Sequence, residues 1–447
     1  MTGWKVKAAL LLGVAGVVGL GAAYGTAELL MRQSANLAGP ASLSDPALLE
    51  RGRYLARAGD CVACHTGPGG KDFAGGLAME TPMGTLYSTN ITPDPETGIG
   101  KYSYGDFVAA VQHGVARGGK PLLPAMPFPS YAVVSQPDMQ AMYAYFRTEV
   151  PAVHRQNTAS TIPWPLNLRW PLAYWTAAFA RQTTFEPTIG QNDSWNRGAY
   201  LIEGLAHCGA CHTPRGIGMQ ETALSDRDGK AFLSGAIIDG WVAKSLRGEM
   251  GAGLGRWGAA DIAKFLKTGR TDSTAAFGGM ADVIHNSTQY LTDADLTSIA
   301  VYLKSLPAAD TSPYRVGDAD LTYDELRSGN YRAPGAAIYV ESCATCHRFD
   351  GDGYKETFPA LAQNPVVLSP QTESLIHITL EGARMPQTYG AAARFAMPGF
   401  ARLGDQEIAD VLSFIRASWG NGAPPVTAKQ VAQMRASTTT PSTGTPK

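Results

Sequence analysis

The sequence carries few charged residues and no excess of either sign. Charged side chains make up 17% of its 447 residues, with 37 Lys and Arg against 38 Asp and Glu, whereas soluble domains usually carry about 25%. A protein that binds nucleic acid would need a basic surface. The charge balance therefore argues against nucleic acid as a partner.

Cysteines and strand-like patterns are also scarce. Six cysteines in a chain of this length exclude a disulfide-dense scaffold. No run of alternating apolar residues is long enough to predict a major sheet. Fifty Gly and 29 Pro residues indicate many loops and short helices. The expected fold class is mainly α, and the length allows roughly two to four domains.

One long uncharged run lies near the N-terminus. It extends from Ala8 to Ala27, after Lys5 and Lys7, and would form an apolar helix of about 30 Å, enough to cross a bilayer core. Because both lysines precede the run, the rest of the chain is expected on the exported side. Residues 1–34 are interpreted as a membrane anchor. A cleaved signal peptide is the alternative, with small residues at 25–27 as its cleavage site.

All six cysteines belong to three copies of one motif, Cys-x-x-Cys-His. The copies begin 147 and 135 residues apart, which is the spacing of domains. A segment that reads as the end of a short helix precedes each copy, and a predicted amphipathic helix closes each repeat. The motif residues are Cys61, Cys64 and His65, then Cys208, Cys211 and His212, then Cys343, Cys346 and His347. The closing helices are expected at about 138–146, 292–303 and 405–415, the second with a capping box from Thr292 to Asp295.

The repeats divide the chain into three tandem domains with connections of different character. The domains are expected at 45–150, 191–306 and 333–420. A Trp- and Pro-rich connection at 151–190 is expected to pack, with a partner surface or lipid headgroups as alternatives, and a more polar linker spans 307–332. The tail, 421–447, ends in Ser, Thr and Pro residues and is expected to be mostly disordered.

The histidine after each cysteine pair decides among three meanings of Cys-x-x-Cys, which are a zinc site, a redox dithiol and haem attachment. In haem c the two thiols bond to the porphyrin vinyl groups from one helical turn, and the histidine ligates the iron. Zinc would need a second ligand pair at matching spacing, which no repeat offers cleanly, and a dithiol does not need the histidine. The sequence therefore predicts three covalently attached haem c groups.

Each iron needs a sixth ligand, which is commonly a methionine in electron-transfer cytochromes. Small class I cytochrome c domains place it about 50–70 residues after the histidine, in a loop before the last helix. One methionine in each repeat fits, and the predicted ligands are Met126, Met280 and Met397, at 61, 68 and 50 residues after His65, His212 and His347. In the third repeat Met385 competes with Met397, and the Pro-Gly-Phe that follows Met397 favours the latter.

Several longer motifs carry a family resemblance that covers about Asp45 to Trp419. They are residues 59–66 around the first cysteine pair, 87–93 (Tyr-Ser-Thr-Asn-Ile-Thr-Pro), 124–127, 207–215, 277–280 and 287–292. With these motifs the chain resembles the triple-haem cytochrome c subunit of membrane-bound dehydrogenases. That family serves quinohaemoprotein alcohol dehydrogenases, flavin-dependent gluconate, sorbitol and fructose dehydrogenases, and molybdenum-containing aldehyde dehydrogenases. The chain departs from it at both ends, which leaves the mode of membrane attachment open.

The resemblance implies an electron-transfer role on the periplasmic side of the bacterial cytoplasmic membrane. A large dehydrogenase subunit that depends on PQQ, flavin or molybdenum would oxidise an alcohol, aldehyde or sugar, and electrons would pass through this chain to ubiquinone. A small subunit is a further candidate partner. The chain itself has no dinucleotide fingerprint and no nucleophile elbow, so no catalytic residue is assigned. The alternatives are a free-standing multihaem enzyme, such as a peroxidase or thiosulfate-type dehydrogenase, and a stand-alone or oxidase-associated carrier.

Overall fold

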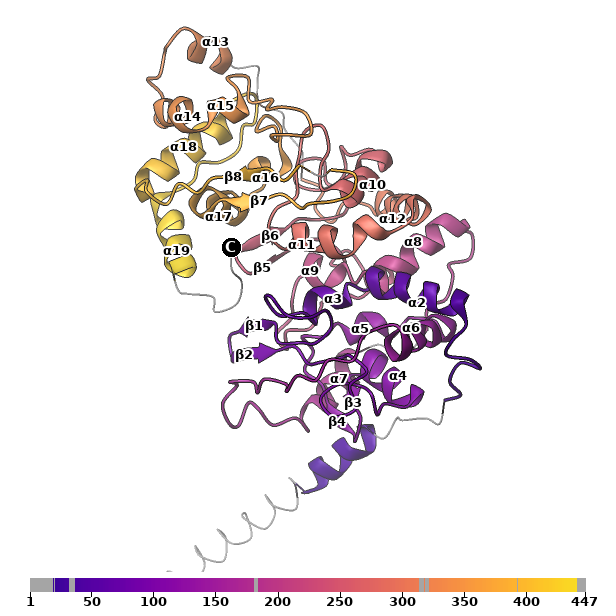
Figure 1. The fold of residues 1–447 in the computed structure, drawn as a ribbon. Coiled ribbons are helices and arrows are strands. Elements are labelled where there is room, and N and C mark those ends of the chain that lie inside the picture. The colour runs from indigo at the N-terminus through magenta and orange to yellow at the C-terminus, as the bar shows by residue number, and fades with distance from the viewer. Residues whose placement is uncertain are drawn as a thin grey trace, which may run out of the picture. The chain divides into compact units, whose positions relative to one another are not determined.

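The computed structural model describes Gly19 and residues 21–31, 37–180, 184–312, 317, 321–391 and 393–439. These residues form mainly helices, as expected (Figure 1). The strands in the described ranges are short and make four antiparallel two-stranded hairpins, so the absence of a major sheet is confirmed there. The chain divides into two compact bodies. The N-terminal body holds residues up to 55 and 64–185, and the C-terminal body holds 56–63 and 186–447.

The first repeat contains five helices and two hairpins within the described residues, followed by one helix in the connection. Its first helix, α2, leads into the first cysteine motif, and α6 closes the repeat, as predicted. The elements are α2 (Pro46–Ala58), α3 (Cys61–Cys64), β1 (Ala78–Thr81), β2 (Gly84–Tyr87), α4 (Tyr104–His113), β3 (Val115–Ala116), β4 (Lys120–Pro121), α5 (Phe128–Tyr131), α6 (Gln136–Thr148) and, in the connection, α7 (Leu172–Phe179).

The second and third repeats lie in the C-terminal body and follow the same order, with a leading helix, a cysteine motif and a closing helix. The second contains α8 (Asp193–Glu203), α9 (Gly209–His212), η1 (Asp226–Asp228), β5 (Ala236–Ile238), β6 (Trp241–Ala243), α10 (Ala259–Thr268), α11 (Gly279–Asn286), η2 (Thr288–Tyr290) and α12 (Asp293–Ser305). After α13 (Thr322–Arg327), the third contains α14 (Ala336–Ser342), α15 (Ala344–His347), α16 (Pro365–Leu368), α17 (Glu373–Glu381), β7 (Ala383–Arg384), β8 (Ala396–Met397), α18 (Asp405–Ala417) and α19 (Ala428–Thr439).

Each repeat packs its leading helix against its closing helix at a glycine. A Cβ on Gly52 of α2 would overlap the Ala141 carbonyl of α6, and a Cβ on Gly198 of α8 would overlap the Ser298 carbonyl of α12. In the third repeat a Cβ on Gly335, at the start of α14, would overlap the Asp410 carbonyl of α18. The helices therefore cross in backbone contact, which only glycine permits.

An ion pair accompanies this crossing in the first two repeats. The guanidinium of Arg51 donates from Nε to Asp138 at 2.6 Å. That of Arg197 donates from Nε and Nη2 to the two carboxylate oxygens of Asp295, at 2.8 and 2.7 Å. The Thr292 hydroxyl also accepts from the Asp295 amide at 3.1 Å and begins α12 where the sequence predicted it. Each pair ties a leading helix to a closing helix.

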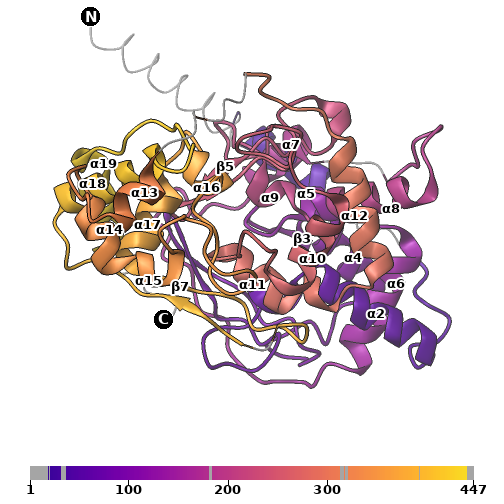
Figure 2. The same cartoon turned by 90° about the horizontal axis from the view of Figure 1, so that it is seen from above.

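The C-terminal tail corrects one expectation. Residues 428–439 form α19, which packs on α17 and α18 (Figure 2), so the prediction of disorder from residue 421 is wrong for this stretch. Val431 and Met434 are buried, and Arg435 donates to Asp405 at 2.8 Å. A short apolar stripe, spaced by three residues, provides this packing, whereas the composition of the segment suggested only polarity. The last residues, 440–447, lie outside the described part of the chain.

The N-terminal prediction is tested only in part. Most of the run from Ala8 to Ala27 lies outside the described residues, whereas residues 21–31 are helical. Ala27 and Met31 pack against α4 and α7 through Ala109 and Ala173. Within the described ranges, none of the helices combines the length and apolarity of a bilayer-crossing segment.

Candidate haem-binding sites

Each cysteine motif forms a helical turn, which is the local structure that haem attachment needs. In the second motif the His212 amide donates to the Cys208 carbonyl at 2.9 Å, and in the third the His347 amide donates to the Cys343 carbonyl at 3.0 Å. The six cysteines, all of which lie in described parts of the chain, form no disulfide with one another. One turn separates the two thiols of a motif, so both can reach the edge of one porphyrin.

The three motif histidines share one further contact that the sequence did not predict. Each ring Nδ1 lies within hydrogen-bond distance of a backbone carbonyl, at 2.7 Å for His65, 2.7 Å for His212 and 2.9 Å for His347. The carbonyls belong to Thr89, Lys244 and Pro359. When Nδ1–H donates to a carbonyl, Nε2 keeps its lone pair, which is the form that binds a metal. Burial also lowers the pKa of all three imidazoles and so favours the neutral ligand.

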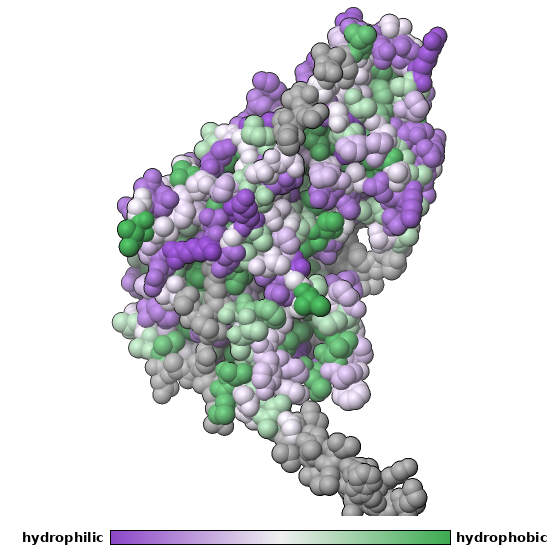
Figure 3. Space-filling view, turned by 180° about the vertical axis from the view of Figure 1, so that it is seen from behind, coloured by the Kyte–Doolittle hydropathy of each residue, from purple (hydrophilic) through white to green (hydrophobic). Residues whose placement is uncertain are grey.

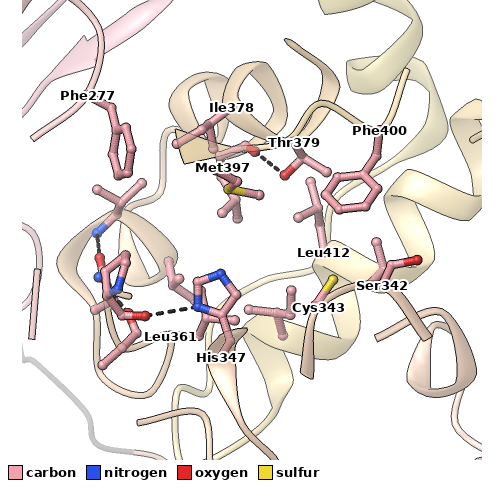
Figure 4. A pocket seen from close by; sticks show the side chains of 18 of the residues that line it. Phe277, Ser342, Cys343, His347, Leu361, Ile378, Thr379, Met397, Phe400 and Leu412 are labelled. Atoms are coloured by element: carbon pink, nitrogen blue, oxygen red, sulfur yellow. Dashed lines mark hydrogen bonds between the residues drawn. The ribbon is translucent and has the colours of Figure 1, made fainter. Parts of the chain in front are cut away.

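The third site contains a cavity of about 840 Å³, counting the space open to solvent at its mouth. His347 and Met397 both line it, and Figure 4 shows the imidazole and the thioether sulfur on opposite sides of the space. Cys343 lies on the same wall as His347. Most other lining residues are apolar, among them Leu375, Phe400 and Leu412. One thiol, one imidazole and one thioether thus lie around an apolar space. This set of donors suits a planar apolar macrocycle with a metal at its centre.

The two methionines that competed for this site are placed differently. Met397 belongs to β8 and borders the cavity. Met385 is only 2% exposed and is absent from the cavity lining. The structure therefore brings Met397, and not Met385, to the cavity of His347.

The other two predicted methionine ligands, Met126 and Met280, each precede the closing helix of their repeat. Met126 lies in the turn before α5, where its carbonyl accepts from the Phe128 amide at 2.8 Å. Met280 is the second residue of α11. Both side chains are half-buried, and their roles as ligands stay predictions.

Two cationic side chains near the second motif, Lys244 and Arg256, are suited to stabilise negative charge at the edge of a bound group. Lys244, whose carbonyl accepts from His212, has a pKa lowered to about 8 by burial and by the nearby charge of Arg256. Its Nζ lies 5.5 Å from the centre of the Trp257 ring. A carboxylate stabilises two neighbouring cations of this kind, and a haem carries two propionates. The sequence did not single out Lys244, because no motif marks it. In the structure Arg215 donates to the Ala210 carbonyl.

The zinc alternative gains no support from the described ranges, in which no group of three or more His, Cys, Asp or Glu side chains is placed to hold a metal ion. The motifs, the Nδ1 contacts and the cavity together match the requirements of haem c. Sequence comparison points the same way, because residues 196–307 and 332–419 match the family described as cytochrome c. Covalently bound haem is the cofactor of that family.

Similar proteins extend over nearly the whole chain. The gluconate 2-dehydrogenase cytochrome c subunit of Pantoea cypripedii is 54% identical over 88% of this chain and 90% of its own length. The cytochrome c subunit of the quinone alcohol dehydrogenase of Gluconobacter oxydans (strain 621H) is 45% identical over 97% of this chain and 87% of its own. The fructose dehydrogenase cytochrome subunit of Gluconobacter japonicus is 37% identical over 89% and 84%. The chain therefore belongs to the family of cytochrome c subunits of dehydrogenases.

Proposed function

We propose that the chain is the triple-haem electron-transfer subunit of a membrane-bound dehydrogenase complex. A large partner subunit, dependent on PQQ, flavin or molybdenum, oxidises an alcohol, aldehyde or sugar, and this chain passes the electrons to ubiquinone. The observation that carries the proposal is the threefold recurrence of a Cys-x-x-Cys turn whose histidine meets a backbone carbonyl through Nδ1. Bound haem supplies reversible one-electron chemistry, and the protein supplies ligands, enclosure and docking.

The repetition of the supporting structure supports the proposal of three haems in three tandem class I domains. Every repeat has a leading helix, a cysteine motif, an Nδ1–carbonyl contact and a glycine crossing to its closing helix. We place the domains at 45–150, 191–306 and 333–420, with residues 151–190 and 307–332 as connections.

The sixth ligands in this proposal are Met126, Met280 and Met397. A thioether favours reduced iron, which suits a carrier of high potential. Six-coordinate irons leave no open position for peroxide or substrate, which separates this function from that of a free-standing multihaem enzyme. The position of Met397 at the cavity of His347 supports its choice over Met385.

Attachment to the periplasmic side of the membrane is supported by the N-terminal run and by apolar side chains near it. Trp170 of the connection stacks edge-on against Tyr24 of the N-terminal helix, at 6.5 Å between ring centres. Nearby in sequence Trp164 is 76% exposed, and Leu29 of the N-terminal helix is 68% exposed. Figure 3 shows apolar side chains reaching the surface of the N-terminal body. Exposed aromatic and aliphatic side chains of this kind suit the headgroup region of a bilayer.

The first test counts haems and partners. The chain, expressed in a strain that matures cytochromes c and extracted in mild detergent, should have the mass of the polypeptide plus three haems. It should co-purify with a large dehydrogenase subunit, and the substrate of that subunit should reduce a ubiquinone analogue. Fewer than three haems, or a chain that always purifies alone, would refute the proposal. A high-spin resting spectrum with fast peroxide turnover would favour the enzymatic alternative.

The second test concerns the third iron and has a matched control. Met397→His replaces the thioether by an imidazole and should lower one of three midpoint potentials, leaving the other two unchanged. Met385→Leu should leave all three unchanged, because it removes a buried side chain outside the cavity. The opposite pattern would transfer the ligand role to Met385.

A further inference from the structure

The cavity of the third site is not built by the third repeat alone. Thr274, Ala275 and Phe277 line it together with His347 and Met397, although they belong to the second repeat. Figure 4 shows the Phe277 ring beside the space between the other labelled residues. Without these residues one side of the cavity would be open.

The same segment leads directly to the predicted ligand of the second iron. Phe277 is followed by Gly278, Gly279 and Met280, so only two glycines separate the wall of one site from the predicted ligand of the other. Gly278 has φ +59°, and a Cβ there would lie 2.7 Å from the Trp241 indole. The indole therefore packs on the backbone between Phe277 and Met280 and fixes its position.

Trp241 also reaches the third repeat. Its ring stacks on His377 of α17, with 4.5 Å between ring centres and 26° between planes. The next residue of β6, Val242, donates its amide to Ser374 at 2.7 Å. Ile378, which follows His377, lines the cavity. The packing that holds segment 274–280 is thus continuous with the helix that forms another part of the cavity wall.

The second repeat also holds in place the segment that orients His347. Pro359 provides the carbonyl for the His347 ring, and the amide of the next residue, Ala360, donates to the Ser273 carbonyl at 3.0 Å. Farther along, Arg256 donates to the Gln363 carbonyl at 2.8 Å. Ser273 directly precedes the residues that line the cavity. The histidine side of the third site and the side closed by Phe277 therefore both depend on one stretch of the second repeat, residues 273–277.

We propose that the second repeat completes the third haem pocket, with Phe277 as the positioning residue that keeps water from the third haem. The proposal rests on the assignment of a haem to each repeat. Ferric haem carries one more positive charge than ferrous haem, so contact with water stabilises the ferric state and lowers the potential. The Phe277 ring should therefore raise the potential of the third haem, although it belongs to the domain of the second.

The test uses the full, matured chain, three variants of the cavity wall and one variant of the predicted iron ligand. Phe277→Ala opens the wall, Phe277→Leu keeps an apolar side chain there, and Phe400→Ala removes a phenyl group that the third repeat itself contributes to the same cavity. Met397→His marks which potential belongs to the third haem. We expect Phe277→Ala and Phe400→Ala to lower the third midpoint potential and leave the second unchanged, and Phe277→Leu to restore most of it. Added imidazole should also displace the thioether of the third iron at a lower concentration in Phe277→Ala.

The outcomes distinguish a failure of the shared pocket from a failure of the haem assignment on which it rests. If Phe277→Ala shifts the second potential and not the third, or shifts neither while Phe400→Ala lowers the third, the shared pocket is refuted. If the chain holds fewer than three haems, or Met397→His moves no potential, the haem assignment fails instead. If Phe277→Ala loses haem during maturation, Phe277→Leu still decides, because a role in water exclusion requires it to keep the third potential close to that of the unmodified chain.

Discussion

Replacing Gly198 by alanine should destabilise the second repeat by forcing α8 and α12 apart. The new Cβ would lie 2.7 Å from the Ser298 carbonyl carbon and 2.8 Å from the Tyr302 Cβ, and it would overlap the Ser298 oxygen. Carbon atoms in contact usually stay at least about 3.5 Å apart. The backbone of α12 would have to move by most of an ångström, because no flexible side chain can yield instead.

The magnitude follows from two opposing effects. Overpacking of a tight core costs about 1–3 kcal/mol, and a backbone obstacle places this site near 3 kcal/mol. Alanine is also a better helix former than glycine by about 0.5–1 kcal/mol. The net loss is about 2 kcal/mol. If the second repeat unfolds as a unit of about 100 residues, this corresponds to a melting temperature lower by roughly 8 °C or more.

Calorimetry of the matured chain measures this shift. Thr297→Ala on the exposed face of α12 is the control, and it should change stability by less than about 0.5 kcal/mol. If Gly198→Ala melts at or above the temperature of the unmodified chain, the reasoning from backbone contact at the helix crossing is wrong.

Three further predictions follow. Asp295→Asn, which weakens the two-bond pair to Arg197, should cost about 2 kcal/mol in thermal unfolding, whereas Asp293→Asn at an exposed site in the same turn should cost less than about 0.5 kcal/mol; equal effects would refute the role of the pair. Burial raises the pKa of Asp60, next to Cys61, well above its usual value, so the folded chain loses stability as the pH rises from about 4. The Asp60→Asn variant should therefore melt at a higher temperature than the unmodified chain at pH 7 but not at pH 4. A difference in melting temperature that stays constant with pH would contradict the pKa shift. Ser103→Ala removes the hydroxyl that accepts from the Asp106 amide in the capping box of α4, and should cost about 1 kcal/mol and speed amide exchange in the first turn of α4; unchanged exchange there would show that the cap is dispensable.

Local features were predictable because their causes lie within a few residues. The Cys-x-x-Cys-His chemistry needs one helical turn, and the apolar spacing of 292–303 and 405–415 predicts α12 and α18, which the structure confirms. The family resemblance is confirmed by relatives along most of the chain. Helix α19 was missed because a buried stripe of Val431 and Met434 is too short to stand out in a polar segment.

The sequence by itself determined the mainly helical class and the family, and it predicted the residues proposed to attach and ligate haem, because these depend on residue types at short spacing. The carbonyls that orient the histidines lie 24, 32 and 12 residues beyond them, and every residue has a carbonyl, so no residue type marks them. Only the tertiary structure brought Met397 rather than Met385 to the cavity and placed Phe277 in the wall of the next site. The physical reason is that enclosure is a property of surfaces that meet, and segments far apart in the chain meet only when it is folded.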